Sequence, residues 1–410
     1  MTTKTGVWLS SREASARLGV KLATLYAYAS RGLITSLPSD GPRGRQYASD
    51  DVERLRTRHA ARSGHGPVAA GALRFGEPVL ETRISEVTAD GPRYRGQLAI
   101  ELCRADVSFE RVAALLWTGA LPERAPHSRV KGTLDVARVW PLLRGRAALP
   151  KMALLLAALA LCDDDRHAAS DAAEWARASV IQRWLASTPS ARVPAVHLSE
   201  RGIAETLLAS WRAPRSRALL QAVDRALVLC AEHELNPSTF AARVAASTGA
   251  DLYACLGAAV NTLSGSEHGG ACDRVEAMIL AIGGKARAAR TVQAWLARAE
   301  PIPGFGHPLS PKGDPRGAAL VELARAHGSK REPAQVAFAL LDAMQRGGHP
   351  APTLDAGLVT LCHTLGLPAG SAATLFSLGR TAGWVAHVLE QRSAGYLLRP
   401  RARYVGPPVV

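Results

Sequence analysis

Hydrophobic positions recur at helical spacing through most of the chain. After residue 98, apolar residues repeat three and four positions apart, which is the pattern of amphipathic helices. The segments with this pattern are 109–118, 152–161, 172–185, 216–230, 254–263, 290–299, 333–344 and 372–390. Residues 79–98 alternate instead, and Asp90-Gly91-Pro92 predicts the turn of a short hairpin. The chain is therefore predicted to be mainly α-helical.

The first 62 residues predict a separate small module. Ser10, followed three residues later by Glu13, is a capping box that begins a helix, and Gly19 predicts the turn that ends it. A second helix follows, with Leu22 and Leu25 expected to face inward. A helix, a glycine turn and a helix in this order predict a helix-turn-helix.

A basic segment completes this module. Residues 31–47 predict a hairpin or wing, and Asp50 opens a third helix. The first 65 residues hold eleven Lys or Arg and five Asp or Glu, a net charge of +6. The module resembles the helix-turn-helix of the MerR and excisionase families over residues 8–58. The resemblance implies that Thr24, Tyr26 and Tyr28 contact DNA. Arg43 and Arg45 would bind its phosphates. The alternative is that the module is a relic or a packing element.

Composition narrows the class of protein. Hydrophobic residues make up 47% of the 410 positions and charged residues 21%, as in folded proteins. The six cysteines form no Cys-x-x-Cys pair, which argues against a zinc site of the usual spacing and against a disulfide scaffold. No apolar leader begins the chain, and its longest apolar run, residues 152–162, falls short of the roughly 18 needed to span a bilayer. A cytoplasmic location without a membrane partner is expected.

The net charge of +15 favours contact with a polyanion, either nucleic acid or the phosphates of a nucleotide. A codon bias toward arginine and alanine explains the same charge. The charge therefore supports two kinds of partner without choosing between them.

Four loops carry histidine or aspartate beside glycine or proline, at residues 230–239, 264–271, 302–316 and 349–357. A single loop histidine is most often a surface group or a satisfied hydrogen-bonding partner. In combination they favour a site, because the glycines around His268 and His307 let a ligand approach the backbone and Asp355 offers a carboxylate base. Three arginines suit a small polycarboxylate, namely Arg316, Arg380 and Arg399.

These loops resemble motifs of the citrate synthase family, in the same order, over residues 79–410. The motifs are Glu81-Thr-Arg-Ile-Ser85, residues 108–122, the segment from His233 to Val244, His268-Gly-Gly-Ala, Gly304-Phe-Gly-His307 with Asp314-Pro-Arg316, Asp355, the segment from Gly379 to His387, and Arg399-Pro-Arg401. Several motifs in register over some three hundred residues make this resemblance specific.

The resemblance implies condensation of an acyl-CoA with oxaloacetate. Asp355 is implied to remove a proton from the acyl carbon, while His268 donates a hydrogen bond to the thioester oxygen and stabilises the enol. His307 is implied to polarise the oxaloacetate ketone. Substrate carboxylates would be held by His233, Arg316, Arg380 and Arg399, the last from the other subunit. Hydrolysis of the thioester then drives the reaction, and no metal or cofactor is needed, since acyl-CoA is a substrate.

The family fold implied is an almost all-helical homodimer or higher even oligomer. Each chain would have a large domain of residues 79–269 and 366–410 and a small domain of residues 270–365 that closes over the substrates. The helix-turn-helix at 1–62 and a linker at 63–78 would precede them.

Departures from the family pattern point to a divergent member. Glu267 stands beside His268 and is expected to raise the pKa of that imidazole. Cys272 replaces the customary asparagine, and prolines follow His307 where basic residues often serve CoA. Two alternatives stay open: propionyl-CoA as donor, which makes 2-methylcitrate, and a DNA-binding regulator that senses an acyl-CoA or citrate.

Overall fold

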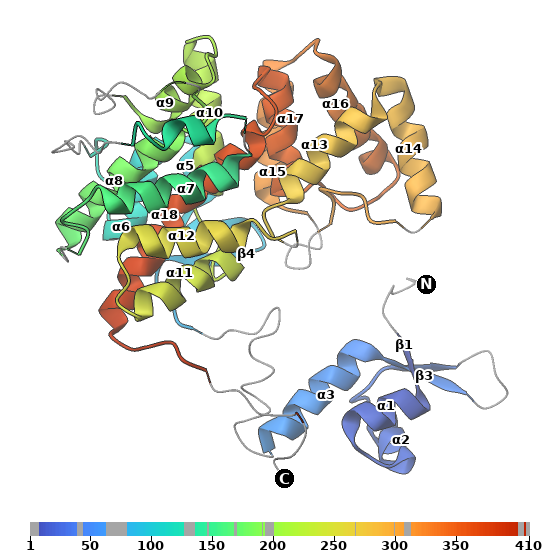
Figure 1. The fold of residues 1–410 in the computed structure, drawn as a ribbon. Helices are drawn as coiled ribbons and strands as arrows, with labels where there is room; N and C mark the ends of the chain where they lie inside the picture. Colours follow the sequence, from blue (N-terminus) through green and yellow to red (C-terminus); the bar gives the residue numbers. More distant parts are fainter. Residues whose placement is uncertain are drawn as a thin grey trace. The chain divides into compact units, whose positions relative to one another are not determined.

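The computed structural model describes residues 8–38, 44–62, 80–126, 136–145, 147–167, 170–190, 192, 201–266, 268–298, 300–306, 313–400 and 406. The chain divides into two compact units, Met1–Glu81 and Thr82–Val410. The elements of both units are labelled in Figure 1.

The first unit is a helix-turn-helix with a three-stranded antiparallel sheet in the order β1-β3-β2. Its elements are β1 (Trp8–Ser10), α1 (Ser11–Leu18), α2 (Leu22–Ser30), β2 (Ser36–Pro38), β3 (Arg45–Ala48) and α3 (Ser49–Arg62). The predicted wing is confirmed, because β2 and β3 pair across the basic segment.

Local signals at the start of α1 are confirmed. The Glu13 amide donates to Ser10 Oγ at 3.3 Å, and the Ser10 amide donates to Glu13 Oε2 at 2.9 Å. Gly19 adopts φ of +63° and ends the helix. Leu25 is fully buried, but the inward prediction for Leu22 is wrong, since 45% of this residue is exposed. Leu22 begins the short helix α2, so its side chain extends past the edge of a small core.

The second unit is almost entirely helical, with one small sheet in the order β4-β5-β6. Its elements are β4 (Ser85–Thr88), β5 (Gly91–Tyr94), β6 (Gln97–Leu98), α5 (Ala99–Arg104), α6 (Phe109–Thr118), η1 (Trp140–Leu143), α7 (Ala148–Leu161), α8 (Asp171–Ala186), α9 (Ile203–Ser210), α10 (Arg217–Cys230), α11 (Pro237–Ser247), α12 (Leu252–Leu263), α13 (Ala271–Ile282), α14 (Lys285–Ala297), α15 (Pro315–His327), α16 (Glu332–Arg346), α17 (Leu354–Leu365) and α18 (Ser371–Ala394).

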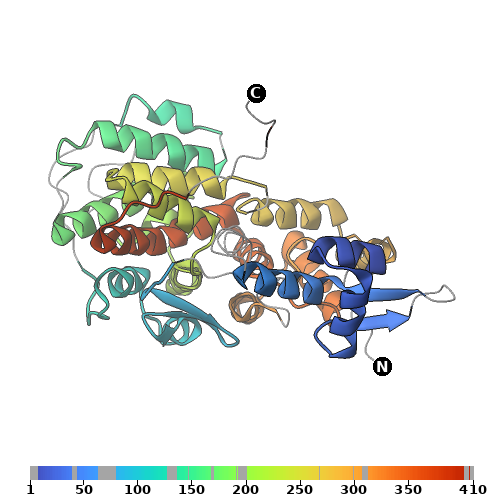
Figure 2. The same ribbon diagram turned by 90° about the horizontal axis from the view of Figure 1, so that it is seen from below.

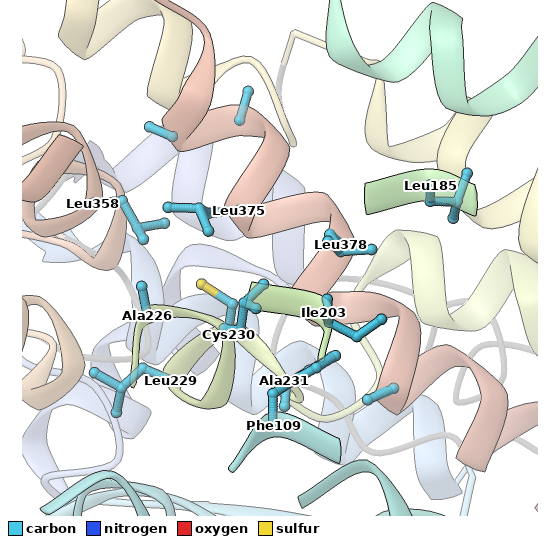
Figure 3. Close-up of a cluster of buried hydrophobic side chains, with 14 of the residues drawn as sticks. Phe109, Leu185, Ile203, Ala226, Leu229, Cys230, Ala231, Leu358, Leu375 and Leu378 are labelled. Atoms are coloured by element: carbon cyan, nitrogen blue, oxygen red, sulfur yellow. The ribbon is translucent and has the colours of Figure 1, made fainter. Parts of the chain in front are cut away.

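Helix α18 forms the centre of the second unit. It packs against α6, α10, α11, α12 and α17, and most of its residues are buried. Figure 2 shows the yellow helix α12 between the red α18 and the green helices. Figure 3 shows where α18 meets its neighbours, with Leu375 and Leu378 among Phe109, Cys230 and Leu358. Burial of a large apolar side chain here contributes about 1.5–3 kcal/mol to the free energy of unfolding. This core therefore holds the ends of the surrounding helices in place.

Helices α13 to α17 pack mainly on one another, with α15 against α17 and α14 against α16. Figure 1 shows this group to one side of the helices around α18. The group spans most of residues 270–365, but the division into a large and a small domain stays a prediction. Among the described residues, no helix is both long and apolar enough to cross a membrane.

Candidate active site

Asp355 lies in the first turn of α17, at the point where α13 and α15 meet that helix. Its Oδ1 accepts a hydrogen bond from Cys272 Sγ at 3.2 Å, and its Oδ2 lies 3.4 Å from Thr353 Oγ1. Burial raises the pKa of Asp355 above its ordinary value, while the Cys272 thiol and the charge of Arg316 oppose that rise. The result is a carboxylate that is a stronger base than an exposed aspartate.

A tight loop fixes the start of α17. The Thr353 amide donates to Gly304 O at 2.8 Å, and the Gly306 amide donates to Ala351 O at 3.3 Å. Gly304 has φ of +83°, and a Cβ at this position would lie 2.9 Å from Ala356 Cβ. Only glycine fits there, because both the backbone conformation and the space exclude a side chain.

His268 lies in a second tight turn, between α12 and α13. Its amide donates to Gly265 O at 3.0 Å, and the Gly269 amide donates to Leu263 O at 2.8 Å. A Cβ on Gly269 would lie 2.2 Å from that same carbonyl oxygen, so glycine is required. The turn places the imidazole against the start of α11.

The hydrogen bonds of His268 determine its tautomer. Ser238 donates to Nε2 from its backbone amide at 3.3 Å, and its Oγ lies 2.9 Å from the same nitrogen. Because a backbone amide can only donate, Nε2 is an acceptor and the ring proton is on Nδ1. Trp384 Nε1 donates to Ser238 Oγ at 3.2 Å and so holds the hydroxyl in place.

Burial, together with the charge of Arg380, lowers the pKa of His268 to about 4. The imidazole is therefore neutral near pH 7 and keeps one N–H to donate. The expectation of a raised pKa was wrong in direction, because desolvation and a positive neighbour act on the ring. Glu267, on which that expectation rested, lies outside the described residues.

Two buried arginines lie in the same region. Arg316, 2% exposed, pairs with Asp314 through Nε at 3.1 Å and Nη2 at 2.8 Å, while its Nη1 is buried without a hydrogen bond to the described residues. Burial opposes this charge, but the Asp314 carboxylate outweighs burial and raises the guanidinium pKa. Arg380, also 2% exposed, donates from Nε to Cys230 O at 3.0 Å and lies over the ring of Phe376.

The two guanidinium groups are close enough to repel each other. Burial lowers the pKa of Arg380, Glu232 raises it, and Arg316 lowers it again. Two like charges held out of water favour an anionic ligand with two negative groups between them.

A buried carboxylate–imidazole contact supports the loop that carries His233. Glu232 Oε1 lies 3.3 Å from His387 Nε2, and Ser85 Oγ donates to the same oxygen at 3.1 Å. Burial acts to raise the pKa of Glu232, but the contacts with His387 hold it below the usual value. His387 is thus a buried core histidine whose ring is engaged by Glu232.

The predicted site residues are brought together in part. His268, Asp355, Arg316 and Arg380 are linked by the contacts and charges above, and His233 follows α10 beside Glu232. Arg399 is exposed after the end of α18, and the described contacts do not join it to the others. His307 lies outside the described residues.

Sequence reasoning missed three side chains that hold this site, namely Ser238, Trp384 and Glu232. Ser238 and Glu232 lie in or beside the motif that begins at His233, so their position was a usable signal. The contact from Trp384 to Ser238 joins residues 146 positions apart, which no local pattern reveals.

Comparison with known proteins defines the class. Residues 74–401 match the family model "Citrate synthase, C-terminal domain", and residues 9–66 match "MerR HTH family regulatory protein". The chain belongs to the citrate synthase family, enzymes that convert an acyl group into an alkyl group on transfer, and it carries a MerR-type helix-turn-helix.

Particular relatives agree with this assignment. The chain is 29% identical over 345 residues to citrate synthase 2 of Bacillus subtilis, covering 79% of this chain and 92% of that protein. It is 32% identical over 354 residues to 2-methylcitrate synthase of Mycobacterium tuberculosis, covering 81% and 89%. The crystal structure of citrate synthase from Pyrobaculum aerophilum matches with a TM-score of 0.71 at 26% identity, covering 81% and 91%.

Proposed function

We propose that the chain condenses acetyl-CoA with oxaloacetate and hydrolyses the product to citrate and CoA. The observation that carries this proposal is the pairing of a neutral, N–H-donating His268 with a basic Asp355 beside two buried arginines. A base, a neutral donor and a dicarboxylate site are the groups this reaction requires.

Asp355 removes a proton from the carbon next to the thioester. An exposed carboxylate is far too weak a base for this step, so two features help it. Burial raises its proton affinity, and His268 donates Nδ1–H to the oxygen on which the enolate charge develops. A neutral imidazole suits this role, because it does not transfer a full charge to the ground-state thioester.

Arg316 and Arg380 bind the two carboxylates of oxaloacetate. The buried Nη1 of Arg316 is a donor without a hydrogen bond to the described residues, and a substrate oxygen satisfies it. His233 and His307 complete the oxaloacetate contacts, with His307 on the ketone, and Arg399 reaches in from the second subunit of a dimer. These last assignments rest on the motifs that the chain shares with its family.

Turnover with purified full-length protein tests the proposal. Loss of thioester absorbance is followed with oxaloacetate and either acetyl-CoA or propionyl-CoA, alongside Asp355→Ala. Turnover that disappears in the variant supports the synthase, and the ratio of kcat/KM for the two donors identifies the product. Because one methyl group changes pocket preference by about 1–3 kcal/mol, both donors must be measured. Folded protein that turns over neither donor would refute the proposal.

A second function is favoured by the N-terminal unit. We propose that it contacts DNA, so that the chain is also a regulator that senses an acyl-CoA or citrate. Tyr26 is 49% exposed and Arg45 is exposed, whereas Thr24 and Tyr28 are partly buried, and Arg43 lies outside the described residues. Helix α2 has no basic residue of its own, so phosphate contacts fall to Arg45 and to the flanks of the helix at Lys21 and Arg31.

Salt dependence tests the DNA proposal. Binding of full-length protein to duplex DNA is measured from low to physiological salt, with and without acyl-CoA or citrate. Each phosphate contact adds about −0.9 to the slope of log K against log salt, so a double Lys21→Ala, Arg31→Ala variant should make this slope less negative by about 2. Negligible binding at low salt would end the regulator hypothesis and leave the enzyme hypothesis untouched.

A further inference from the structure

Among the described residues, Cys272 is the one side chain of α13 that forms a hydrogen bond with Asp355, the proposed catalytic base. It is the second residue of α13 and lies four positions after His268. The turn that holds His268 is fixed by Gly269, as shown above. The distance from the enol-stabilising histidine to the thiol is therefore determined by a rigid turn and the first turn of a helix.

The thiol can only donate in this contact. Cys272 is 2% exposed, and burial followed by the charge of Asp355 holds its pKa well above the usual range. A protonated thiol has one hydrogen, and an ionised carboxylate only accepts. The 3.2 Å contact is thus Sγ–H donating to Oδ1.

The two carboxylate oxygens are held unequally. Oδ1 is bound by Cys272 from another helix, whereas Oδ2 has a 3.4 Å contact with Thr353 in its own helix cap. Oδ2 therefore has no side-chain hydrogen bond from another helix among the described residues, and we assign it as the oxygen that accepts the proton. A thiol is also a weak donor, so it orients a carboxylate while withdrawing little of its basicity.

We propose that Cys272 is a positioning residue for the condensation: its thiol holds Oδ1 of Asp355 and leaves Oδ2 directed at the acyl carbon. This inference rests on the proposed synthase function. Cys272 stands where the family pattern has an asparagine, so a weak thiol donor replaces a strong amide donor. The consequence of this replacement is a more basic Asp355.

Other groups near Asp355 act on its charge and must stay constant in a test. From α15, Arg316 favours the ionised form and Asp314 opposes it. From the end of α10, the buried Cys230 thiol is also near. None of these three is altered by substitution at Cys272, so a change in pH dependence reports the thiol.

The experiment compares Cys272→Ala, Cys272→Ser and Cys272→Asn with the wild type and with Cys255→Ala. Cys255 is the matched control, because it is a fully buried thiol on α12 that contacts a backbone carbonyl, Ala250 O, at 3.6 Å instead of a carboxylate. Turnover is followed by thioester absorbance, so that protein thiols do not interfere, and kcat is recorded against pH.

Loss of the donor should lower kcat for Cys272→Ala about tenfold, with the KM for oxaloacetate changed less than about twofold. Without Sγ–H the pKa of Asp355 rises, so the base is protonated at a higher pH and the acid limb of kcat moves upward. Serine should recover kcat to within about threefold, and asparagine, a stronger donor, should move the acid limb downward. Cys255→Ala should match the wild type in both readouts.

If Cys272→Ala keeps the kcat and the pH profile of the wild type, the positioning role of Cys272 is refuted, whereas the proposed synthase function is unaffected. A loss of kcat with an unmoved acid limb and no recovery by serine would also overturn it, because that pattern is a packing defect. If the alanine variant does not fold, the serine and asparagine variants decide the question, because both are stronger donors than a thiol and should move the acid limb downward. A folded wild type without turnover refutes the proposed function, and the positioning role falls with it.

Discussion

Substitution of Gly304 by alanine perturbs the loop that supports Asp355. Gly304 has φ of +83°, and a Cβ built there would lie 2.7 Å from Val275 Cγ2 and 2.9 Å from Ala356 Cβ. The left-handed conformation costs an L-residue about 1–2 kcal/mol. Overpacking of this kind costs about 1–3 kcal/mol more, so Gly304→Ala should destabilise the second unit by about 2–5 kcal/mol.

Gly306, two residues further on, separates the two costs. It has φ of +74°, but among the described residues a Cβ there would meet only Pro350 Cβ at 3.5 Å and Pro350 Cγ at 3.8 Å, which is ordinary contact. Gly306→Ala should therefore cost only the backbone term of about 1–2 kcal/mol. The difference between the variants isolates the packing of the loop against α13 and α17.

Urea unfolding of the two variants and the wild type measures this difference, with the slope of the transition checked for constancy. Turnover should fall about tenfold or more in Gly304→Ala, because the Thr353 amide bonds Gly304 O and a displaced loop moves the cap of the helix that bears Asp355. Equal destabilisation of both variants would refute the reasoning, since it would mean that the loop has room for a side chain.

Four further outcomes follow from the site. Because burial raises the pKa of Asp355 and the base form is active, kcat should fall as pH drops through a value above that of an ordinary carboxylate. His268, with a pKa of about 4, should add no limb between about pH 5 and 8, and a limb near pH 6.5 that vanishes in His268→Gln would contradict this. Arg380→Lys keeps the positive charge but loses the two-pronged guanidinium donor. The KM for oxaloacetate should therefore rise about tenfold, while the KM for acyl-CoA stays within about twofold. Equal increases in both KM values would count against a carboxylate contact. If Arg399 completes the neighbour's site, a random mixture of refolded Asp355→Ala and Arg399→Ala subunits should regain about a quarter of wild-type turnover, whereas an Arg399 that acts in its own site gives none.

Local signals predicted the elements of this protein well. The predicted helix at 109–118 has the observed bounds of α6, and the capping box at Ser10 is present. These features depend on neighbours within a few residues, which a sequence displays directly. Leu22 was misplaced because the edge of a small core is set by the whole unit and not by the helix that carries the residue.

The site was predictable as a set of residues but not as a set of contacts. Glycines and histidines in register located the loops, yet the pKa of His268 depends on Arg380, which is 112 positions away. The bond from Cys272 to Asp355 spans 83 positions. Chemistry that arises from burial and distant charge has no local pattern, so even the direction of the His268 shift required the fold.

The two buried arginines support the proposed binding of a small dianion at this site. Each guanidinium is 2% exposed, and the described acids near them are already engaged, Asp314 with Arg316 and Glu232 with His387. Arg316 still lowers the pKa of Arg380, and burial prevents water from screening this repulsion. A ligand with two carboxylates offers an acceptor to each guanidinium, whereas a monocarboxylate satisfies only one of them. Burial and then the charge of Arg380 lower the pKa of His268, so one of the arginines that we propose to bind oxaloacetate also helps to keep the imidazole neutral. In the proposed reaction, selection for the dianion and preparation of the enol-stabilising donor thus arise from one arrangement of charges.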